Sequence, residues 1–198
     1  MAARIAVLAS GGGTNLQAMI DYYARTGDAA GSIELVASNR ASAGALKRAR
    51  AAGIPDEAFD AGDDGTSLTL LLERWAIDLV VLAGYLKHIP ASVISAYRGR
   101  MINIHPGLLP QSGGAGMYGA RVHAAVLASG ATTTGLTVHF VDDEYDHGPV
   151  IAQWRVRVRI DDTAESLAER VLSAEHMVYP RVVDMVAALN TAGLAADF

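Results

Sequence analysis

Cysteine is absent from this chain of 198 residues, which excludes disulfides, thiolate zinc sites and a cysteine nucleophile. The absence fits a reducing compartment. Aromatic residues make up only 6 % and charged residues 19 %, whereas 51 % of the residues are hydrophobic. That apolar content is enough for a sizeable core and argues against a disordered chain. The length fits one domain.

Positive charge is in deficit, because 16 Lys and Arg residues stand against 21 Asp and Glu residues, a net charge of −5. A nucleic-acid-binding surface needs a dense basic face, so nucleic acid is not expected as a partner. No apolar run reaches the roughly 18 residues that cross a bilayer, and the N-terminal segment lacks a signal-peptide pattern. We therefore expect a cytoplasmic protein, a monomer or homodimer, that acts on small molecules without a membrane partner.

The first half of the chain alternates short apolar runs with segments of helical spacing. Strands are predicted over residues 4–9, 33–38, 79–82 and 101–104, and helices over residues 16–24, 43–52, 66–75 and 90–97. Apolar runs without polar alternation are typical of strands buried on both faces. This pattern predicts an α/β fold with a Rossmann-like parallel sheet covered by helices.

The second half departs from that pattern. A glycine-rich loop over residues 111–119 precedes a helix predicted over residues 122–129. Residues 133–141 and 150–160 are rich in β-branched side chains and bracket a polar turn, which predicts an antiparallel pair. A long final helix opens at a capping-box-like segment, residues 162–165, and runs towards residue 190. We predict a single domain, residues 1–198, with a Rossmann-like half over 1–104 and a second half over 105–198.

A glycine turn, Ser10-Gly11-Gly12-Gly13-Thr14-Asn15, follows the first predicted strand. Free amides at a helix start suit a phosphate, and glycines allow close approach of the backbone. A plain tight turn is an equally good interpretation of this segment alone. Position 16 is Leu16 rather than glycine, and no Gly-Lys-Ser/Thr follows, so a dinucleotide or a nucleoside triphosphate is disfavoured.

A second polar feature, Asn103 and His105, ends the strand predicted over residues 101–104. Strand alternation places both side chains on one face, where an amide donor and a titratable imidazole suit an oxyanion and a proton transfer. A solitary histidine at a strand end usually bonds only to a neighbouring loop. The paired Asn103, the following Pro106 and the glycine-rich loop favour a functional role here.

The acidic segment of residues 142–149 forms the turn between the two β-rich runs. Such clusters are usually solvated turns. One of its carboxylates, placed against His105, would instead keep that imidazole protonated and accept a proton from an attacking amine. The six histidines show no metal-ligand spacing, so no metal site is expected.

These segments, in this order and spacing, resemble the phosphoribosylglycinamide formyltransferase family, whose members use 10-formyltetrahydrofolate as formyl donor. The combination of Asn-x-His-Pro with a distant Asp is specific to folate-dependent formyltransferases. The matching segments are residues 10–16, 80–85, 103–110, 138–142 and 146–151, followed by Glu175-His176 and Tyr179-Pro180. The resemblance implies the formyltransferase fold, with an antiparallel C-terminal strand pair and a long C-terminal helix.

The resemblance also implies roles for particular residues, with no metal. Asn103, His105 and Asp146 would be catalytic. The ribonucleotide phosphate and glycinamide would be held by Gly12, Gly13, Thr14, Asn15, Pro106 and Glu175. Folate would be held by Leu86, Lys87, His88, Ile89, Asn103, Val141, Asp142 and Asp146. The implied reaction moves the formyl group directly to the amine of 5′-phosphoribosylglycinamide, in de novo purine biosynthesis.

Three departures from the family pattern stand in this sequence: the loop of residues 111–119, the absence of an arginine in residues 63–67 near the folate, and Leu172 in place of a polar residue. Two related enzymes and a binding module are alternatives to the implied function. Methionyl-tRNA formyltransferase normally has an added tRNA-binding domain and a basic face, and formyltetrahydrofolate hydrolase an added regulatory domain. A non-catalytic folate- or nucleotide-binding module would have no need of the three catalytic residues.

Overall fold

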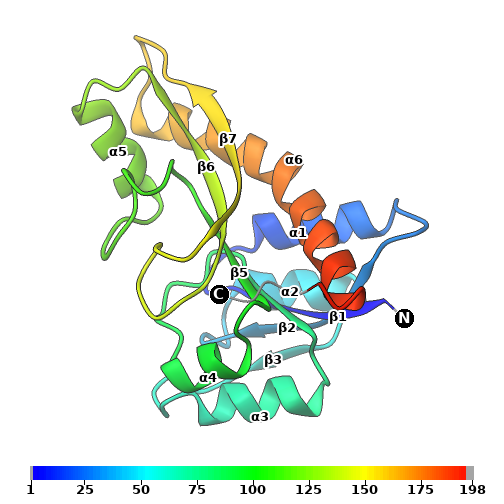
Figure 1. Ribbon diagram of the computed structural model, residues 1–198. Coiled ribbons are helices and arrows are strands. Elements are labelled where there is room, and N and C mark those ends of the chain that lie inside the picture. The colour runs from blue at the N-terminus through cyan, green and yellow to red at the C-terminus, as the bar shows by residue number, and fades with distance from the viewer. Residues whose placement is uncertain (1, 195–198) are drawn as a thin grey trace.

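The alternating segments of the first half form a parallel sheet in the structure, a computed structural model that describes residues 2–194 (Figure 1). Its strands are β1 (Ala3–Leu8), β2 (Gly31–Ser38), β3 (Asp56–Ala58), β4 (Leu79–Leu82) and β5 (Met101–His105). The strands β6 (Thr133–Phe140) and β7 (Val150–Arg157) extend the sheet in antiparallel pairing. The order in the seven-stranded sheet is β3-β2-β1-β4-β5-β6-β7. The predicted α/β class, with its antiparallel C-terminal pair, is confirmed.

Helices cover both faces because the central strands are apolar on both faces. In β1, Ile5 and Val7 pack into one cluster of buried residues, and Ala6 and Leu8 into another. The first cluster lies under α1 (Thr14–Tyr23), α2 (Gly44–Ala51), α5 (Ala120–Ala128) and α6 (Ala164–Thr191). The second lies under α3 (Thr66–Arg74) and α4 (Ala91–Ala96).

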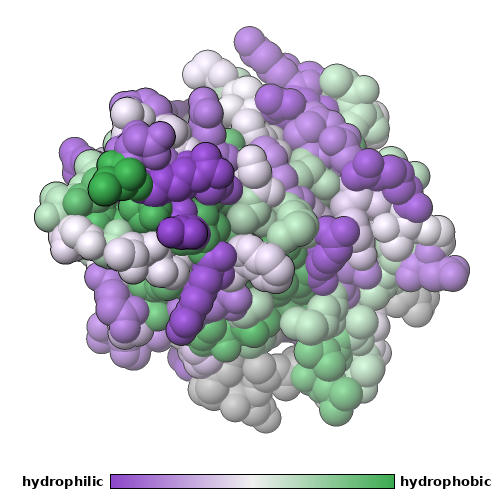
Figure 2. Space-filling model, turned by 90° about the horizontal axis from the view of Figure 1, so that it is seen from above, coloured by the Kyte–Doolittle hydropathy of each residue, from purple (hydrophilic) through white to green (hydrophobic). Residues whose placement is uncertain are grey.

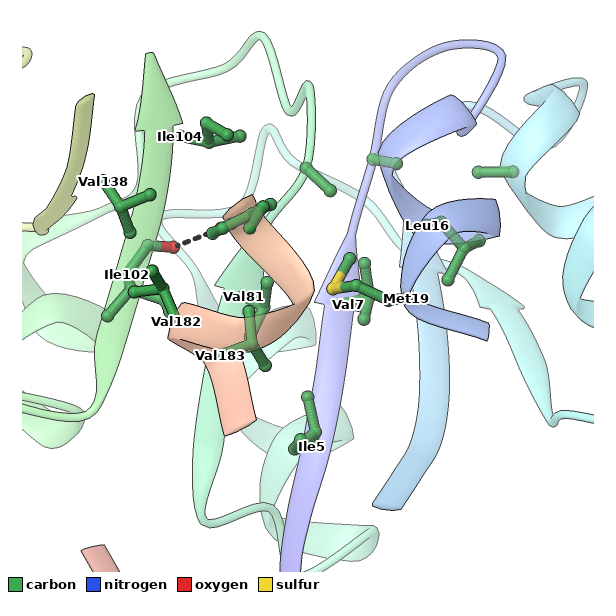
Figure 3. Packing of buried hydrophobic residues seen from close by; sticks show 14 of the residues in the cluster. Ile5, Val7, Leu16, Met19, Val81, Ile102, Ile104, Val138, Val182 and Val183 are labelled. Carbon is green, nitrogen blue, oxygen red and sulfur yellow. Dashed lines mark hydrogen bonds between the residues drawn. The ribbon is translucent and has the colours of Figure 1, made fainter. Parts of the chain in front are cut away.

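The longest helix, α6, crosses the sheet and joins its two halves. The hydroxyl and amide of Thr163 exchange hydrogen bonds with Ser166, which caps the first turn. Further along, Val182 and Val183 pack beside residues of β1, β4 and β5 (Figure 3). The hydroxyl of the fully buried Tyr179 donates a hydrogen bond to the Leu82 carbonyl at 2.8 Å. The long C-terminal helix is thus confirmed.

Several local predictions differ from the structure. The edge strand β3 was not predicted, because Asp56-Glu57-Ala58 has neither apolar alternation nor β-branched side chains. Helix α1 begins at Thr14 rather than residue 16, and β7 ends at Arg157 rather than residue 160. Pro90 is the N-cap of α4 and not part of its first turn. These ends are decided by backbone hydrogen bonds that residue patterning does not specify.

The surface seen from above mixes hydrophilic and hydrophobic side chains in small areas (Figure 2). Within residues 2–194, no helix is both long and apolar enough to pass through a bilayer.

Candidate active site

A cavity of about 620 Å³ opens at the carboxyl ends of β4 and β5. This is where open α/β sheets usually bind their ligands. Twelve of the residues expected at the site line it: Asn15, Leu86, Lys87, His88, Ile89, Asn103, His105, Pro106, Val141, Asp142, Asp146 and Glu175. Gly12 and Gly13 lie in the turn before α1, and Thr14 is the first residue of this helix. Within the described residues, none of the three lines the cavity.

His105 lines the cavity and is only 2 % exposed. Its Nδ1 lies 3.3 Å from Asp146 Oδ2, and its Nε2 lies 2.8 Å from the Ser112 carbonyl oxygen. Because a carbonyl can only accept, Nε2 donates to Ser112 and carries a proton. The other ring nitrogen, Nδ1, is the one that faces the acidic segment through Asp146.

Asp146 is the carboxylate of the acidic segment that reaches His105, and its φ of 56° is in the left-handed region. Burial acts to raise the pKa of this carboxyl, but the neighbouring side chains of His105 and His139, the charge of His105 and the Gly114 amide outweigh burial. The pKa of Asp146 therefore lies well below its usual range, and the carboxylate is ionised at neutral pH.

His139 is a site residue that sequence reasoning missed. It lies directly opposite Asn103 in the β5–β6 pairing. Its Nδ1 donates to the Phe140 carbonyl at 2.8 Å, so its Nε2 accepts a hydrogen bond from the Asn103 amide nitrogen at 3.1 Å. The same Nε2 lies 3.6 Å from Asp146 Oδ1. His139 thus orients the Asn103 amide, a role that becomes visible only once the two strands are paired.

The glycine turn before α1 is shaped by a close approach to α2. Gly13 has a φ of 74°, and a Cβ atom there would lie 2.7 Å from Ala45 Cα. No side chain caps the helix, so its first amides are not bonded by a capping group. Arg48, which sequence reasoning also missed, brings a guanidinium here, since its Nε donates to the Gly12 carbonyl at 2.8 Å. Helix amides and a cation together suit a phosphate.

Glu175 connects α6 with the first turn of α1. Asn15 Nδ2 donates to Glu175 Oε2 at 2.7 Å, while Asn15 Oδ1 is buried and has no hydrogen-bond partner within the described residues. Burial raises the pKa of the Glu175 carboxyl, although the hydrogen bond from Asn15 and the charge of His105 oppose the shift. The pair offers polar groups to a ligand at the end of the cavity nearest to α1.

The opposite end of the cavity is more apolar and aromatic. Leu86 and Tyr145, about half exposed, line it together with Ile89 and Val141. His88 contacts the Tyr145 ring edge to face, with centroids 4.9 Å apart, and its Nε2 lies 3.2 Å from the Asp143 carbonyl oxygen. This wall suits a flat aromatic ligand with polar edges.

The Formyl transferase family model matches residues 3–183. The chain belongs to this family. The family match and the predicted resemblance therefore agree.

Curated relatives of this formyl transferase chain carry a more specific name. This chain is 44 % identical over 190 residues to "Phosphoribosylglycinamide formyltransferase, chloroplastic" of Arabidopsis thaliana, and the match covers 92 % of this chain and 65 % of that protein. It is 40 % identical over 189 residues to the phosphoribosylglycinamide formyltransferase of Escherichia coli (strain K12), covering 92 % of this chain and 86 % of the relative. The chain spans 65 % and 60 % of the lengths of the Arabidopsis thaliana and Vigna unguiculata proteins.

Solved structures agree on the fold. The crystal structure of glycinamide ribonucleotide transformylase 1 from Geobacillus kaustophilus matches with a TM-score of 0.87 at 35 % identity, covering 94 % of this chain and 100 % of that one. Phosphoribosylglycinamide formyltransferase from Anaplasma phagocytophilum matches with a TM-score of 0.86 at 36 % identity, over 94 % and 88 % of the two chains.

A third imidazole, His123 of α5, also lines the cavity of this formyl transferase chain and was missed from the sequence. Burial, aided by the charge of His105, lowers the pKa of His123, which favours its neutral form. Among residues 2–194, no cluster of three or more histidine and carboxylate side chains could hold a metal ion.

Proposed function

We propose that this chain transfers the formyl group of 10-formyltetrahydrofolate to the amine of 5′-phosphoribosylglycinamide. The products are 5′-phosphoribosyl-N-formylglycinamide and tetrahydrofolate, in de novo purine biosynthesis. The observation that carries the proposal is the presence of Asn103, His105 and Asp146 in one cavity, with the His105 imidazole against the Asp146 carboxylate. The names of the relatives support the choice of acceptor and donor.

In the proposed reaction, the amine nitrogen attacks the formyl carbon while the carbon–oxygen double bond becomes an oxyanion. The Asn103 amide and His105 Nδ1 are the donors for this oxyanion, and losing one such donor typically raises a barrier by about 2.7–4 kcal/mol. The bond from carbon to the folate N10 then breaks as the oxyanion collapses. The amine proton passes to N10, and Asp146 assists this transfer. No covalent enzyme intermediate is formed.

The ribonucleotide is proposed to bind at the α1 end of the cavity. The turn of Gly12, Gly13 and Thr14 would hold its phosphate on backbone amides, with Arg48 supplying a positive charge beside the Gly12 carbonyl. Asn15, Pro106 and Glu175 would contact the sugar and glycinamide. The unpaired Asn15 Oδ1 supports this placement, since a buried acceptor without a partner is costly unless a ligand satisfies it.

Folate is proposed to bind at the aromatic end. Leu86, Lys87, His88 and Ile89 would form one wall, and Val141, Asp142 and Asp146 the other. This assignment is supported by the cavity that these residues share and by the apolar character of its wall.

We also propose a cytoplasmic enzyme of small-molecule substrates, a monomer or homodimer, in which residues 1–104 provide the phosphate-binding half and residues 105–198 the folate-binding and catalytic half. The cysteine-free composition supports a reducing compartment.

The test is a spectrophotometric assay with 10-formyltetrahydrofolate, with and without the ribonucleotide. Turnover only in the presence of the ribonucleotide is the expected result. Donor consumption without it would indicate a formyltetrahydrofolate hydrolase instead. Donor binding with no turnover under either condition would indicate a non-catalytic module, and both results would overturn the proposal.

A further inference from the structure

The loop that follows His105 reaches both partners of the His105–Asp146 pair through its backbone. The Ser112 carbonyl oxygen lies 2.8 Å from His105 Nε2, and the Gly114 amide donates to Asp146 Oδ2 at 3.2 Å. The side chain of Ser112 takes part in neither contact. The loop therefore acts on the pair through main-chain groups, which is why residue patterning does not reveal it.

Two glycines permit this close approach. A Cβ atom on Gly107 would lie 2.6 Å from Ser112 Cβ and 3.1 Å from His105 Nε2. A Cβ atom on Gly113 would collide with Leu109 Cδ2 and lie 3.0 Å from Asp146 Cβ. Neither residue has a positive φ, so space rather than backbone conformation requires glycine at both positions.

The base of the loop is anchored to the antiparallel strands. The Leu109 amide donates to Thr137 Oγ1 at 3.1 Å, and that hydroxyl donates to the Gly107 carbonyl at 2.8 Å. From β7, Gln153 Nε2 donates to the Leu109 carbonyl at 2.9 Å. The Ser112 amide in turn donates to the Leu108 carbonyl at 3.0 Å. These bonds hold the Ser112 carbonyl in place relative to β5, which carries His105.

We propose that the Ser112–Gly114 backbone is a positioning element that keeps a proton on His105 Nε2, so that Nδ1 is the nitrogen left to bind a second proton and to donate it in a hydrogen bond to the oxyanion. The proposal rests on the proposed formyl transfer for its kinetic consequence. A backbone carbonyl cannot donate, so Nε2 keeps its hydrogen when His105 is neutral. Nδ1 then carries a lone pair opposite the ionised Asp146, and a proton on Nδ1 removes that repulsion.

The tautomer is tested directly by nitrogen NMR of the full chain with ¹⁵N-labelled imidazole, at a pH at which His105 is neutral. A protonated Nε2 and an unprotonated Nδ1 are expected. The Nδ1-protonated tautomer, or an equal mixture of both, would overturn the proposal. This measurement needs no substrate, so its result is independent of whether the chain transfers a formyl group.

The kinetic test is Gly113→Ala, which forces the loop away from Leu109 and Asp146. A small misplacement of a catalytic group costs up to about 100-fold in rate, so we expect kcat to fall about 10- to 100-fold with both KM values within about twofold. The pH profile of kcat should shift, and the neutral His105 signals should become those of a tautomer mixture. A merely structural role would not produce these two changes.

Gly27→Ala is the matched control, because Gly27 lies in a turn far in sequence from Gly113, has no positive φ and has open space where a Cβ would be. It should leave kcat, the pH profile and the imidazole signals unchanged. If Gly113→Ala behaves like this control, the loop does not position His105. If Gly113→Ala does not fold, the tautomer of the unmodified chain still decides the proposal.

Discussion

One carboxylate, Asp146, faces two imidazoles and a backbone amide at the centre of the cavity. His105 and His139 approach its two oxygens from neighbouring strands, and Gly114 approaches from the loop. These neighbours keep Asp146 ionised in spite of its burial. The negative charge of Asp146 is therefore maintained by tertiary contacts rather than by exposure to solvent.

The first prediction concerns this pair. His105→Ala and Asp146→Asn should each lower kcat about 100- to 1,000-fold, the effect typical of removing an oxyanion donor. Ribonucleotide affinity, measured by calorimetry without folate, should stay within about threefold, because neither residue belongs to the turn proposed to hold the phosphate. Asp161→Asn, an exposed change outside the cavity, is the control. Full activity in either site variant would remove that residue from the mechanism.

A second prediction at this scale concerns His147, which is exposed and pairs with Asp142 at 2.8 Å. The hydrogen bond that His147 donates to Asp142 and the charges of Asp142 and Glu144 raise the pKa of His147 above its ordinary 6.5. Because the folded state binds this proton more tightly, the interaction of protonated His147 with Asp142 stabilises the fold fully below about pH 6.5. The stabilisation is lost as the pH rises through the raised pKa of His147. The urea midpoint of His147→Asn should therefore fall below the parent's near pH 5.5 and equal it near pH 9.

The partner residue supplies the control for that experiment. Asp142→Asn should remove the same pH-dependent difference, and adding His147→Asn to it should change the midpoint no further. A difference between parent and His147→Asn that persists unchanged at pH 9 would contradict the pairing as its cause.

At the scale of elements, the β1–turn–α1 segment shows how one glycine serves two requirements. Gly13 has a left-handed φ, and its missing Cβ lets α2 approach through Ala45. The turn that presents the helix amides therefore depends on the packing of a second helix. Arg48 of α2 is brought to the Gly12 carbonyl by the same approach.

Gly13→Ala is predicted to destabilise the fold by about 2–4 kcal/mol, the sum of left-handed strain and overpacking. Gly53→Ala is the matched control, since its φ of 70° is similar but no atom lies within 4 Å of the added Cβ. That control should cost only about 1–2 kcal/mol. Urea denaturation of both variants measures the difference, and equal losses would show that the contact with Ala45 is unimportant.

Arg48→Leu is predicted to raise the KM for the ribonucleotide about tenfold, because the phosphate would lose a charged partner. The KM for the folate donor should not change, since Arg48 is not among the residues of the cavity wall within the described chain. Arg50→Leu on the same helix, whose guanidinium pairs with Asp56, is the control. An unchanged ribonucleotide KM in Arg48→Leu would separate this residue from phosphate binding.

At the scale of the whole molecule, the two sequence halves share one sheet and one long helix. The strand β5, which ends the first half, pairs with β6 of the second, and α6 packs against the first-half strand β1. A division of the chain near residue 104 therefore separates functions in our proposal without separating folding units.

A single cooperative unfolding transition follows from that arrangement. The two tryptophans lie in different halves, Trp75 after α3 and Trp154 in β7. Trp75→Phe and Trp154→Phe each leave one fluorescent reporter, and both single-tryptophan variants should show coincident fluorescence and circular-dichroism transitions. Two separated midpoints within one variant would mean that the halves unfold independently.

Residue patterning was sufficient for most elements and for part of the candidate site. Apolar runs predicted β1, β2, β4, β5 and the β6–β7 pair within a few residues, because burial on both faces leaves a strong compositional signal. Strand alternation also placed Asn103 and His105 on one face of β5. The polar strand β3 left no such signal, since it lies at the sheet edge and only three of its residues pair.

The sequence by itself determined the α/β class, the family resemblance and the residue types that could carry a proton transfer. Only the tertiary structure decided which of the four acids in residues 142–149 faces His105, and that His139 orients Asn103. It also decided that the Ser112 carbonyl and the Gly114 amide complete the arrangement. The physical reason is that local patterning records burial and backbone preference, whereas hydrogen-bond geometry between distant segments depends on strand register and loop packing.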